Sequence, residues 1–424
     1  MTTDPAREPF LLVYLHGEQI AEITRSAGKI GRLRYIDHGV PMLSTAMSPT
    51  IGRHPWKALG PWIEGLLPER PELLMQWRRQ FGIRDQSPLS LLAYVGEECA
   101  GAARFIRPDR ISQALGNSGL RPLSEAKIAA HLRVSLAAGS PATDEQGRFS
   151  LAGAQAKITL YQDTAGQWFM PTGDTPTTHI IKPVIPGMPG QELTEHMMLT
   201  AARGVGLSCA TSVVATFEGV PTVVVRRYDR IREGGSVRRV HQEDFTQALG
   251  LLPSRKHQSR GGPGPVQIVD HLRAHVAPAH AQHDVERFVQ ALIFNWLTLG
   301  TDAHAKNYSL LLDRNEARLA PLYDLNSYLA LEANPHAKMS MRIGVAEYAD
   351  AVARADWTDL AVAAGVDEEW LMSEIRRQAE VIPSALLEVL IHLRDDGVDI
   401  SGSPLRLVEA AVDWTGVAVR NVTG

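Results

Sequence analysis

The sequence is poor in cysteine, since Cys99 and Cys209 are the only two in 424 residues. Two distant cysteines cannot build a disulfide framework, and the lack of a C-x-x-C pair excludes the common cysteine-based zinc and redox motifs. Long apolar runs are also lacking, because the most apolar stretch, residues 289–299, is too short to span a bilayer and contains Asn295. The polar N-terminus has no signal-peptide core. We therefore expect a soluble protein of the reducing cytoplasm.

A strong excess of either charge is absent as well. The 43 Lys and Arg residues nearly balance the 47 Asp and Glu residues, which gives a formal net charge of −4. This balance excludes a protein that binds nucleic acid through an overall basic composition. The near-neutrality is an average, however. Residues 226–260 hold nine basic and four acidic side chains, whereas residues 344–424 hold six basic and fifteen acidic ones.

The hydrophobic pattern predicts an α+β protein in three parts. Residues 1–108 begin with a hairpin around His16 and Gly17 and continue with short helices, which indicates a β-rich N-terminal subdomain. Residues 109–245 contain strand signals and two helical stretches, at 122–132 and about 193–203, and residues 246–424 are mostly helical by period. The apolar content of 44% is typical of a globular chain that buries a sizeable core.

The helical character begins after Tyr228 in this reading and has one interruption, a hairpin at residues 308–322. The stretch 254–265 is the densest in Gly and Pro, so we expect it to be a mobile loop.

The strongest chemical signal lies on either side of the hairpin predicted at residues 308–322. Asp302 and Asn307 have the spacing D-x-x-x-x-N, and Asp324 follows the hairpin. A kinase catalytic loop uses this spacing, with the Asp accepting the proton of the substrate hydroxyl and the Asn holding a metal ion. A second carboxylate after a strand suits the other metal contact. The alternative is structural, with Asp302 and Asn307 capping a helix end and Asp324 opening a turn.

Two further segments could bind phosphate. Lys182 lies on a predicted strand, and Glu195 in the following helix is its candidate partner. Residues 150–157 are mostly small and precede a strand, so their backbone N–H groups could approach a phosphate. The alternatives are a surface lysine before Pro183 and an ordinary tight turn.

Other catalytic patterns are weaker. His271 and His275 share a helix face, but the stretch lacks the Glu of H-E-x-x-H and Arg273 lies between them, which argues against zinc. Ser140 is not in a G-x-S-x-G elbow, so it is no nucleophile candidate.

Taken in order, these segments resemble the HipA family, the serine/threonine kinase toxins of bacterial toxin–antitoxin pairs. The resemblance covers almost the whole chain. Two positions depart from the family pattern, which usually has Glu or Pro at Ala156 and Glu or Gln at Arg226. The matching segments are 66–69, 91–92, 99–102, 149–157, 179–183, 226–230, 242–250, 261–264, 301–307 and 321–324.

The resemblance implies a role for each matching residue. Asp302 would be the catalytic base, and Asn307 and Asp324 would hold magnesium. Ser150 would be the self-phosphorylation site, where an added phosphate would compete with the nucleotide for the loop. The residues implied in ATP binding are Ala152, Gly153, Ala154, Gln155, Ala156, Lys157, Lys182, Glu195, Arg226, Arg227, Tyr228, His304, Lys306, Asn307, Tyr323 and Asp324.

The resemblance also implies a two-lobed protein-kinase-like fold with a helical C-terminal lobe, and ATP and Mg²⁺ as cofactors. The expected substrate is a protein serine, on an aminoacyl-tRNA synthetase such as glutamate–tRNA ligase. The expected partner is a HipB-like helix-turn-helix antitoxin, through which the chain would mainly meet operator DNA, with no membrane involved. The basic stretch 226–260 is then either a solvated face or an electropositive rim for ATP or an RNA-bound partner.

Two rival functions stay open at this point. One is a pseudokinase that acts as a co-repressor with the antitoxin. The other is a kinase of another substrate class, a lipid or a small molecule, because no acceptor motif is recognisable.

Overall fold

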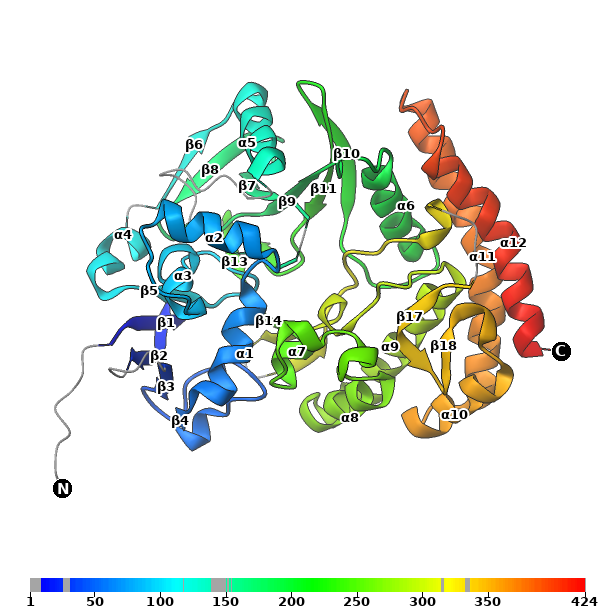
Figure 1. The fold of residues 1–424 in the computed structure, drawn as a ribbon, viewed down its shortest axis with the longest axis horizontal. Helices are drawn as coiled ribbons and strands as arrows, with labels where there is room; N and C mark the ends of the chain where they lie inside the picture. Colours follow the sequence, from blue (N-terminus) through cyan, green and yellow to red (C-terminus); the bar gives the residue numbers. More distant parts are fainter. Residues whose placement is uncertain are drawn as a thin grey trace. The chain divides into compact units, whose positions relative to one another are not determined.

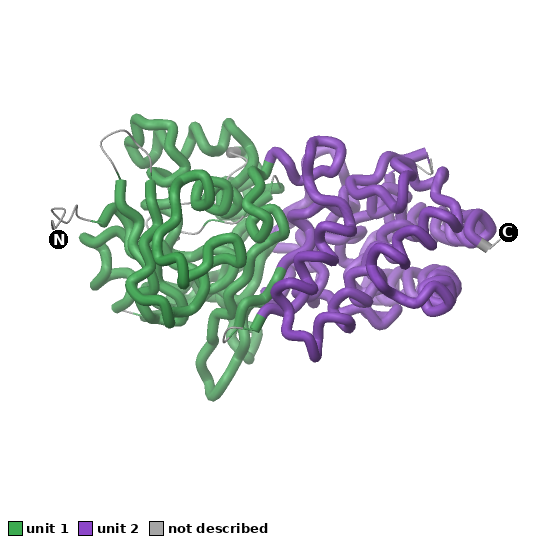
Figure 2. Tube along the Cα trace, turned by 90° about the horizontal axis from the view of Figure 1, so that it is seen from below, with its two compact units in different colours: residues 1–181, 229–253, 310–316 green, residues 182–228, 254–309, 317–424 purple. Residues whose placement is uncertain are grey.

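The computed structural model describes residues 9–25, 31–116, 118–138, 150, 152–153, 155–313, 316–331 and 336–423. The chain forms two compact units, and each is assembled from three separate stretches (Figure 2). Unit 1 consists of residues 1–181, 229–253 and 310–316. Unit 2 consists of residues 182–228, 254–309 and 317–424.

Unit 1 begins with an antiparallel five-stranded sheet in the order β4-β3-β2-β1-β5. Its apolar side chains form a buried core, in which Trp62, Trp77 and Phe105 are among the fully buried side chains. The hairpin predicted at His16 and Gly17 is confirmed, because β1 and β2 pair antiparallel on either side of this turn. The elements are β1 (Leu11–Leu15), β2 (Glu18–Arg25), β3 (Gly31–Tyr35), β4 (Arg53–His54), α1 (Trp56–Leu66), α2 (Pro71–Gln80), α3 (Pro88–Val95) and β5 (Arg104–Ile106).

The rest of unit 1 contains antiparallel strands that pair in the order β6-β8-β7-β9. The chain leaves unit 1 inside β9, at Lys182. The elements are α4 (Ile111–Leu115), β6 (Gly119–Pro122), α5 (Glu125–Ala138), β7 (Ile158–Gln162), β8 (Trp168–Thr172), β9 (His179–Pro183), β12 (Arg230–Glu233), β13 (Ser236–Arg239), β14 (His241–Asp244) and α7 (Phe245–Ala248).

Unit 2 is mostly helical. Helices α11 and α12 pack along each other as a long hairpin, coloured orange to red in Figure 1, and α6 packs against α11. Three tryptophans link its core, because the indole of Trp414 donates to the Trp296 carbonyl at 3.0 Å and the Trp296 and Trp357 rings lie edge to face. The elements are α6 (Gln191–Gly204), β10 (Ser212–Phe217), β11 (Val220–Arg226), α8 (Pro265–His275), α9 (Pro278–Leu297), β17 (Lys338–Ile343), β18 (Ala346–Tyr348), α10 (Arg354–Ala364), α11 (Glu368–Asp395) and α12 (Ser403–Thr423).

Strands β15 (Ser309–Asp313) and β16 (Glu316–Leu319) carry the chain out of unit 2 and back. They confirm the predicted hairpin within the helical half. In the part of the chain that the structure describes, no helix combines the length and the apolar composition needed to cross a membrane.

The predicted α+β class is confirmed, with a β-rich N-terminal region and a mostly helical C-terminal region. The prediction that helices follow Tyr228 directly is wrong, because β12, β13 and β14 come next, and β17 and β18 also lie in the helical half. The two compact units do not decide the predicted boundaries at residues 108 and 245, so that division stays a prediction.

Candidate active site

The centre of the candidate site is a buried lysine held between two carboxylates of unit 2. Lys182 lies on β9, and its Nζ is 2.7 Å from Glu195 Oε1 and 2.7 Å from Asp324 Oδ1. Glu195 projects from α6 and is fully buried, whereas the Asp324 side chain is 44% exposed. The predicted pairing of Lys182 with Glu195 is confirmed. The ion cluster is thus buried at one end and open to solvent at the other.

The electrostatics of this cluster keep Lys182 charged. Burial on its own lowers the pKa of the Lys182 ammonium, because a low-dielectric environment disfavours a charge. The carboxylates of Asp324 and Glu195 outweigh that effect and raise the pKa above its ordinary value. Lys182 therefore carries a permanent positive charge next to the exposed carboxylate of Asp324.

Asn307 lies beside Asp324, so two oxygen-bearing side chains meet there. The Asn307 amide nitrogen donates to Asp324 Oδ2 at 3.3 Å, and the Asn307 amide oxygen accepts from the backbone N–H of His304 at 3.2 Å. A carboxylate and an amide oxygen are donors that suit a hard divalent cation carrying phosphate ligands. The residues present therefore fit the metal that the sequence predicted at Asn307 and Asp324.

Asp302 is exposed on a loop whose ends are held tightly. Before it, the backbone N–H of Gly300 donates to the Asn295 carbonyl at 2.6 Å, and a Cβ at residue 300 would lie 2.3 Å from the Asn295 side chain, so only glycine fits. After it, the Tyr323 hydroxyl donates to the Lys306 carbonyl at 2.6 Å. The loop therefore presents an exposed carboxylate in a defined position, as a general base requires.

His304 and Tyr228 complete the surroundings of the loop. His304 is 6% exposed, and burial, followed by the electrostatic effects of Lys256 and His257, lowers its pKa to about 3. Its imidazole is therefore neutral at physiological pH. The Tyr228 ring packs on Tyr323 with 5.6 Å between ring centroids. This contact brings the predicted adenine segment to the residue before Asp324.

The other two residues of the predicted adenine segment behave differently from each other. Arg226 is exposed at the end of β11, and its backbone N–H donates to the Thr211 carbonyl at 2.8 Å, so this N–H is not available to a nucleotide. Arg227 is buried. Lys306, also predicted to contact ATP, is 7% exposed, so only a small part of its surface is accessible to solvent.

The predicted phosphate loop belongs to unit 1, and Leu151 and Ala154 lie outside the described residues. Ser150 is fully buried, and its hydroxyl donates to the Leu66 carbonyl at 2.8 Å. The Lys157 ammonium donates to the Ala152 carbonyl at 2.7 Å. Gly153 has φ of +105°, a conformation that favours glycine. Gln155 is half-buried and Ala156 is buried. The roles of these residues toward phosphate stay predictions.

Sequence reasoning missed the segment that borders the catalytic loop. The stretch 254–265 contains two 3-10 turns, η3 (Pro253–Arg255) and η4 (Gln258–Arg260), rather than an irregular loop. The Lys256 carbonyl accepts from the Ala305 N–H at 3.1 Å, and the His257 and His304 rings lie edge to face. The expected mobile loop therefore contacts the catalytic loop through one backbone hydrogen bond and one ring contact. A high content of Gly and Pro predicts turns, but it does not predict which distant segment the turns will contact.

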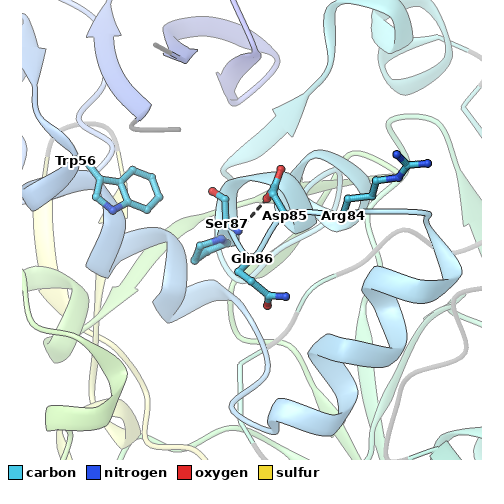
Figure 3. Close-up of a pocket in the computed structure, with 6 residues that line it drawn as sticks. Trp56, Arg84, Asp85, Gln86 and Ser87 are labelled. Carbon is cyan, nitrogen blue, oxygen red and sulfur yellow. Dashed lines mark hydrogen bonds between the residues drawn. The ribbon is translucent and has the colours of Figure 1, made fainter. Parts of the chain in front are cut away.

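A cavity of about 320 Å³ in unit 1 contains none of the predicted site residues. Figure 3 shows Trp56 on one side and Arg84 to Ser87 on the other, with the Ser87 N–H donating to Asp85 Oδ1 at 2.8 Å. Asp85 is also held by Arg25 and Ser90. The pocket is thus built around a structural carboxylate, and the predicted chemistry lies elsewhere.

Comparison with known proteins finds matches to two family models and to related proteins over most of the chain. The model of the HipA-like C-terminal domain matches residues 149–386, and that of the HipA N-terminal domain matches residues 11–106. The putative kinase Y4mE of Sinorhizobium fredii is 34% identical over 345 residues, which are 80% of each chain. The serine/threonine-protein kinase toxin HipA of Shewanella oneidensis is 26% identical over 367 residues, 82% of this chain and 81% of that one.

A solved structure extends the comparison to the fold. It is the complex of HipA, HipB and operator DNA from Shewanella oneidensis MR-1, matched with a TM-score of 0.81 at 23% identity, over 97% of this chain and 99% of that chain.

The fold resembles that of the Shewanella oneidensis HipA structure, and it holds a buried Lys–Glu pair beside an Asp and an Asn. Protein kinases use such a pair, with an Asp and an Asn, toward phosphate and metal. The chain belongs to the HipA family, and with it to the serine/threonine-protein kinases. The predicted family is confirmed, whereas the role of each site residue stays a prediction.

Proposed function

We propose that this protein is an ATP- and Mg²⁺-dependent serine/threonine protein kinase that acts as the toxin of a toxin–antitoxin pair. The observation that carries the proposal is the contact of Lys182 with both Glu195 and Asp324, at 2.7 Å each, beside Asn307. A structural ion pair needs no exposed second carboxylate. A site for nucleotide phosphate and its metal ion does, because both ligands must reach the cluster from solvent.

The chemistry would be divided among four side chains. Lys182 supplies a fixed positive charge toward the phosphates, and Glu195 keeps its stem oriented. Asn307 and Asp324 would hold magnesium, which when bound neutralises charge on the phosphate oxygens. Asp302 would accept the proton of the acceptor hydroxyl. Catalysis then rests on positioning and electrostatic stabilisation, with little covalent work for the protein.

The family resemblance supports an aminoacyl-tRNA synthetase as the target, such as glutamate–tRNA ligase. Its phosphorylation would stop tRNA charging, and growth arrest and persistence would follow. The Shewanella oneidensis structure contains HipA with HipB and operator DNA. This supports a HipB-like helix-turn-helix antitoxin as partner, contact with DNA mainly through it, and action in the cytoplasm.

Self-phosphorylation on Ser150 is part of the proposal, and it requires a change in this segment. The Ser150 hydroxyl is fully buried and donates to the Leu66 carbonyl. A phosphate carries about −1.5 to −2 charges at pH 7 and cannot stay against a carbonyl oxygen in a buried position. The modified serine would therefore leave its place and take the neighbouring turn at Gly153 with it.

Two experiments test the function. Calorimetry should detect Mg-ATP binding, and a failure to bind would favour the pseudokinase reading. Labelled ATP added to a cell lysate should mark a protein, identified by mass spectrometry, while a labelled lipid or metabolite would indicate the other kinase class.

Asp302→Asn should lower phosphate transfer by about 10²–10⁴-fold, the usual contribution of a general base. The fold should be unchanged, because Asp302 is exposed. The exposed Asp359→Asn on α10 is a matched control that should keep full activity. Retained transfer in Asp302→Asn would refute the role of this carboxylate.

A further inference from the structure

Two histidines and the candidate catalytic base form a second cluster in unit 2. One ligand atom each of His257, Asp302 and His304 lies within 4.8 Å of the other two. The two imidazole rings lie edge to face, with 5.1 Å between centroids and 84° between planes. His257 comes from the segment that precedes η4, so a tertiary contact brings it to the catalytic loop.

His304 gives an independent indication that this cluster takes a ligand. It is 6% exposed, and its Nδ1 is buried without a hydrogen-bond partner among the residues that the structure describes. A buried polar atom left unpaired is unfavourable, and such atoms are rare in native proteins. A ligand bound at this cluster would explain why the Nδ1 of His304 is buried without a partner.

His257 is oriented as metal-binding histidines usually are. Its Nδ1 lies 3.0 Å from Ser340 Oγ, a hydroxyl on the neighbouring strand β17. A hydrogen bond at one ring nitrogen leaves the other to face a metal, and such partners orient the ring. The backbone N–H of Ser340 donates to the Thr301 carbonyl at 2.9 Å, so the supporting strand is tied to the same loop that carries Asp302.

The ligand types select the metal. Two imidazoles and a carboxylate are the set found around Zn²⁺ with an open fourth position, and ligand atoms of such a site are roughly 3–3.5 Å apart. The three side chains, whose ligand atoms lie within 4.8 Å of one another, therefore need to move only slightly closer to bind Zn²⁺. Mg²⁺ prefers oxygen ligands alone, which Asn307 and Asp324 provide. The two neighbouring groups of side chains thus differ in the metal that each suits.

We propose that His257, Asp302 and His304 form a Zn²⁺ site that is distinct from the magnesium site and that switches the kinase off when it is filled. A zinc ion bound by Asp302 takes the carboxylate lone pairs that would accept the proton of the substrate hydroxyl. The inhibitory role rests on the proposed kinase function, whereas the metal site itself does not. The ammonium of Lys256 acts on His304 electrostatically and opposes the ion, which limits the affinity.

Binding is tested without nucleotide, with Co²⁺ as the spectroscopic probe for Zn²⁺. Titration of the full chain should give one equivalent of tetrahedral visible absorption that Zn²⁺ bleaches. His257→Gln and Asp302→Asn should each weaken binding by about tenfold or more. His336→Gln is the matched control, because His336 also lies 3.1 Å from a carboxylate, that of Asp350. Equal binding by wild type and both site variants, or equal loss in His336→Gln, would overturn the site.

Inhibition is tested with free Zn²⁺ set by a metal buffer and with Mg-ATP in excess. Wild-type transfer should fall as the site fills, while His257→Gln should resist at least tenfold higher free zinc. Equal inhibition of the two proteins would overturn the inhibitory role, since the zinc would then act elsewhere, for example at Asp324. If the wild type transfers no phosphate at all, the proposed function fails, and the Co²⁺ titration still decides the metal site.

Discussion

Each unit contains a buried ion cluster, and the two clusters are built from different cations. Unit 2 has Lys182 between Glu195 and Asp324. Unit 1 has Arg230 and Arg239 around Glu98. Lysine is a compact charge on a flexible stem, whereas the planar guanidinium of arginine donates in fixed directions. The lysine of unit 2 can therefore also interact with a ligand, whereas the arginines of unit 1 are used for hydrogen bonds within the protein.

The arginine cluster of unit 1 is fully used in holding the fold. Arg230 donates to Glu98 at 2.9 Å and to the carbonyls of Thr177 and Gly101 at 3.1 and 3.0 Å. Glu98 also accepts from Arg239 at 2.7 Å and from the Thr177 hydroxyl at 2.8 Å. Its side chain is 12% exposed, against 44% for Asp324. Partners within unit 1 thus occupy this carboxylate, whereas solvent reaches the one beside Lys182.

This difference teaches how to separate structural from functional ion clusters in one chain. Burial and short distances are common to both and do not discriminate. What distinguishes the unit 2 cluster is an exposed carboxylate held by a lysine, next to Asn307. Replacing each cluster's cation should therefore affect different properties of the protein.

Lys182→Met should have the largest effect on activity. Loss of a fixed charge aimed at a developing one typically costs about 10²–10³-fold in rate. It should also destabilise the fold by about 3–5 kcal/mol, because Glu195 is left buried without its cation. The rate is measured per folded molecule, and stability by urea unfolding.

The double variant Lys182→Met, Glu195→Leu separates the two effects. An apolar pair in place of a buried ion pair is often neutral or stabilising, so the stability should return. The activity should stay low. Recovery of both together would mean that the cluster is structural, like the one in unit 1.

Arg230→Met should give the opposite result. Removing the guanidinium leaves Glu98 and several carbonyls short of donors, and we expect a loss of about 3–5 kcal/mol in the free energy of unfolding. Phosphate transfer per folded molecule should stay within about twofold of wild type. If Arg230→Met lost activity while keeping the stability of the wild type, the unit 1 cluster would not be purely structural.

Asp284→Asn sharpens the comparison with a structural cluster inside unit 2. Burial raises the pKa of Asp284, but its hydrogen bonds with Arg318 at 2.9 Å and with the Leu319 N–H at 2.8 Å outweigh this, so the pKa lies below 3.8. The variant should lose about 1.5–3 kcal/mol at pH 7, the range for hydrogen bonds to charged groups.

The pH dependence of this variant has a defined sign. A carboxylate with a lowered pKa stabilises the fold above its unfolded pKa, and the contribution is lost as the pH falls through the folded value. The difference between Asp284→Asn and wild type should therefore be constant above about pH 5 and shrink below pH 3.8. Unfolding midpoints across this range measure it, and a difference that grows on acidification would contradict the assignment.

The sequence predicted the parts of the site whose residues lie close together along the chain. Asp302, Asn307 and Asp324 are carried by one loop and one hairpin, and Lys182 and Glu195 by one strand and the next helix. Such local units keep their residues together whatever the rest of the fold does. His257 could not be predicted, because only a tertiary contact places it beside His304.

The missed strands have a related cause. Strands β12 and β13 consist largely of arginine and glutamate, whose burial depends on pairing with Glu98 and other distant groups. Hydrophobic alternation, the usual signal of a half-buried strand, is therefore weak there. The same arginines that made residues 226–260 look like a solvated or electropositive surface are in part buried structural cations, as Arg230 shows.

Ser150→Ala should have the smallest effect on stability, and it tests whether Ser150 is the site of self-phosphorylation. Its hydroxyl makes one hydrogen bond, to the Leu66 carbonyl, so the fold should lose only about 0.5–1.5 kcal/mol. Self-phosphorylation should nearly disappear in mass spectrometry, while transfer to other proteins continues, because Ser150 belongs to neither ion cluster. Ser90→Ala, which removes a hydroxyl donating to Asp85 in the same unit, is the control that should keep the modification. Phosphate found elsewhere at wild-type levels would show that a buried serine in unit 1 has only a structural role.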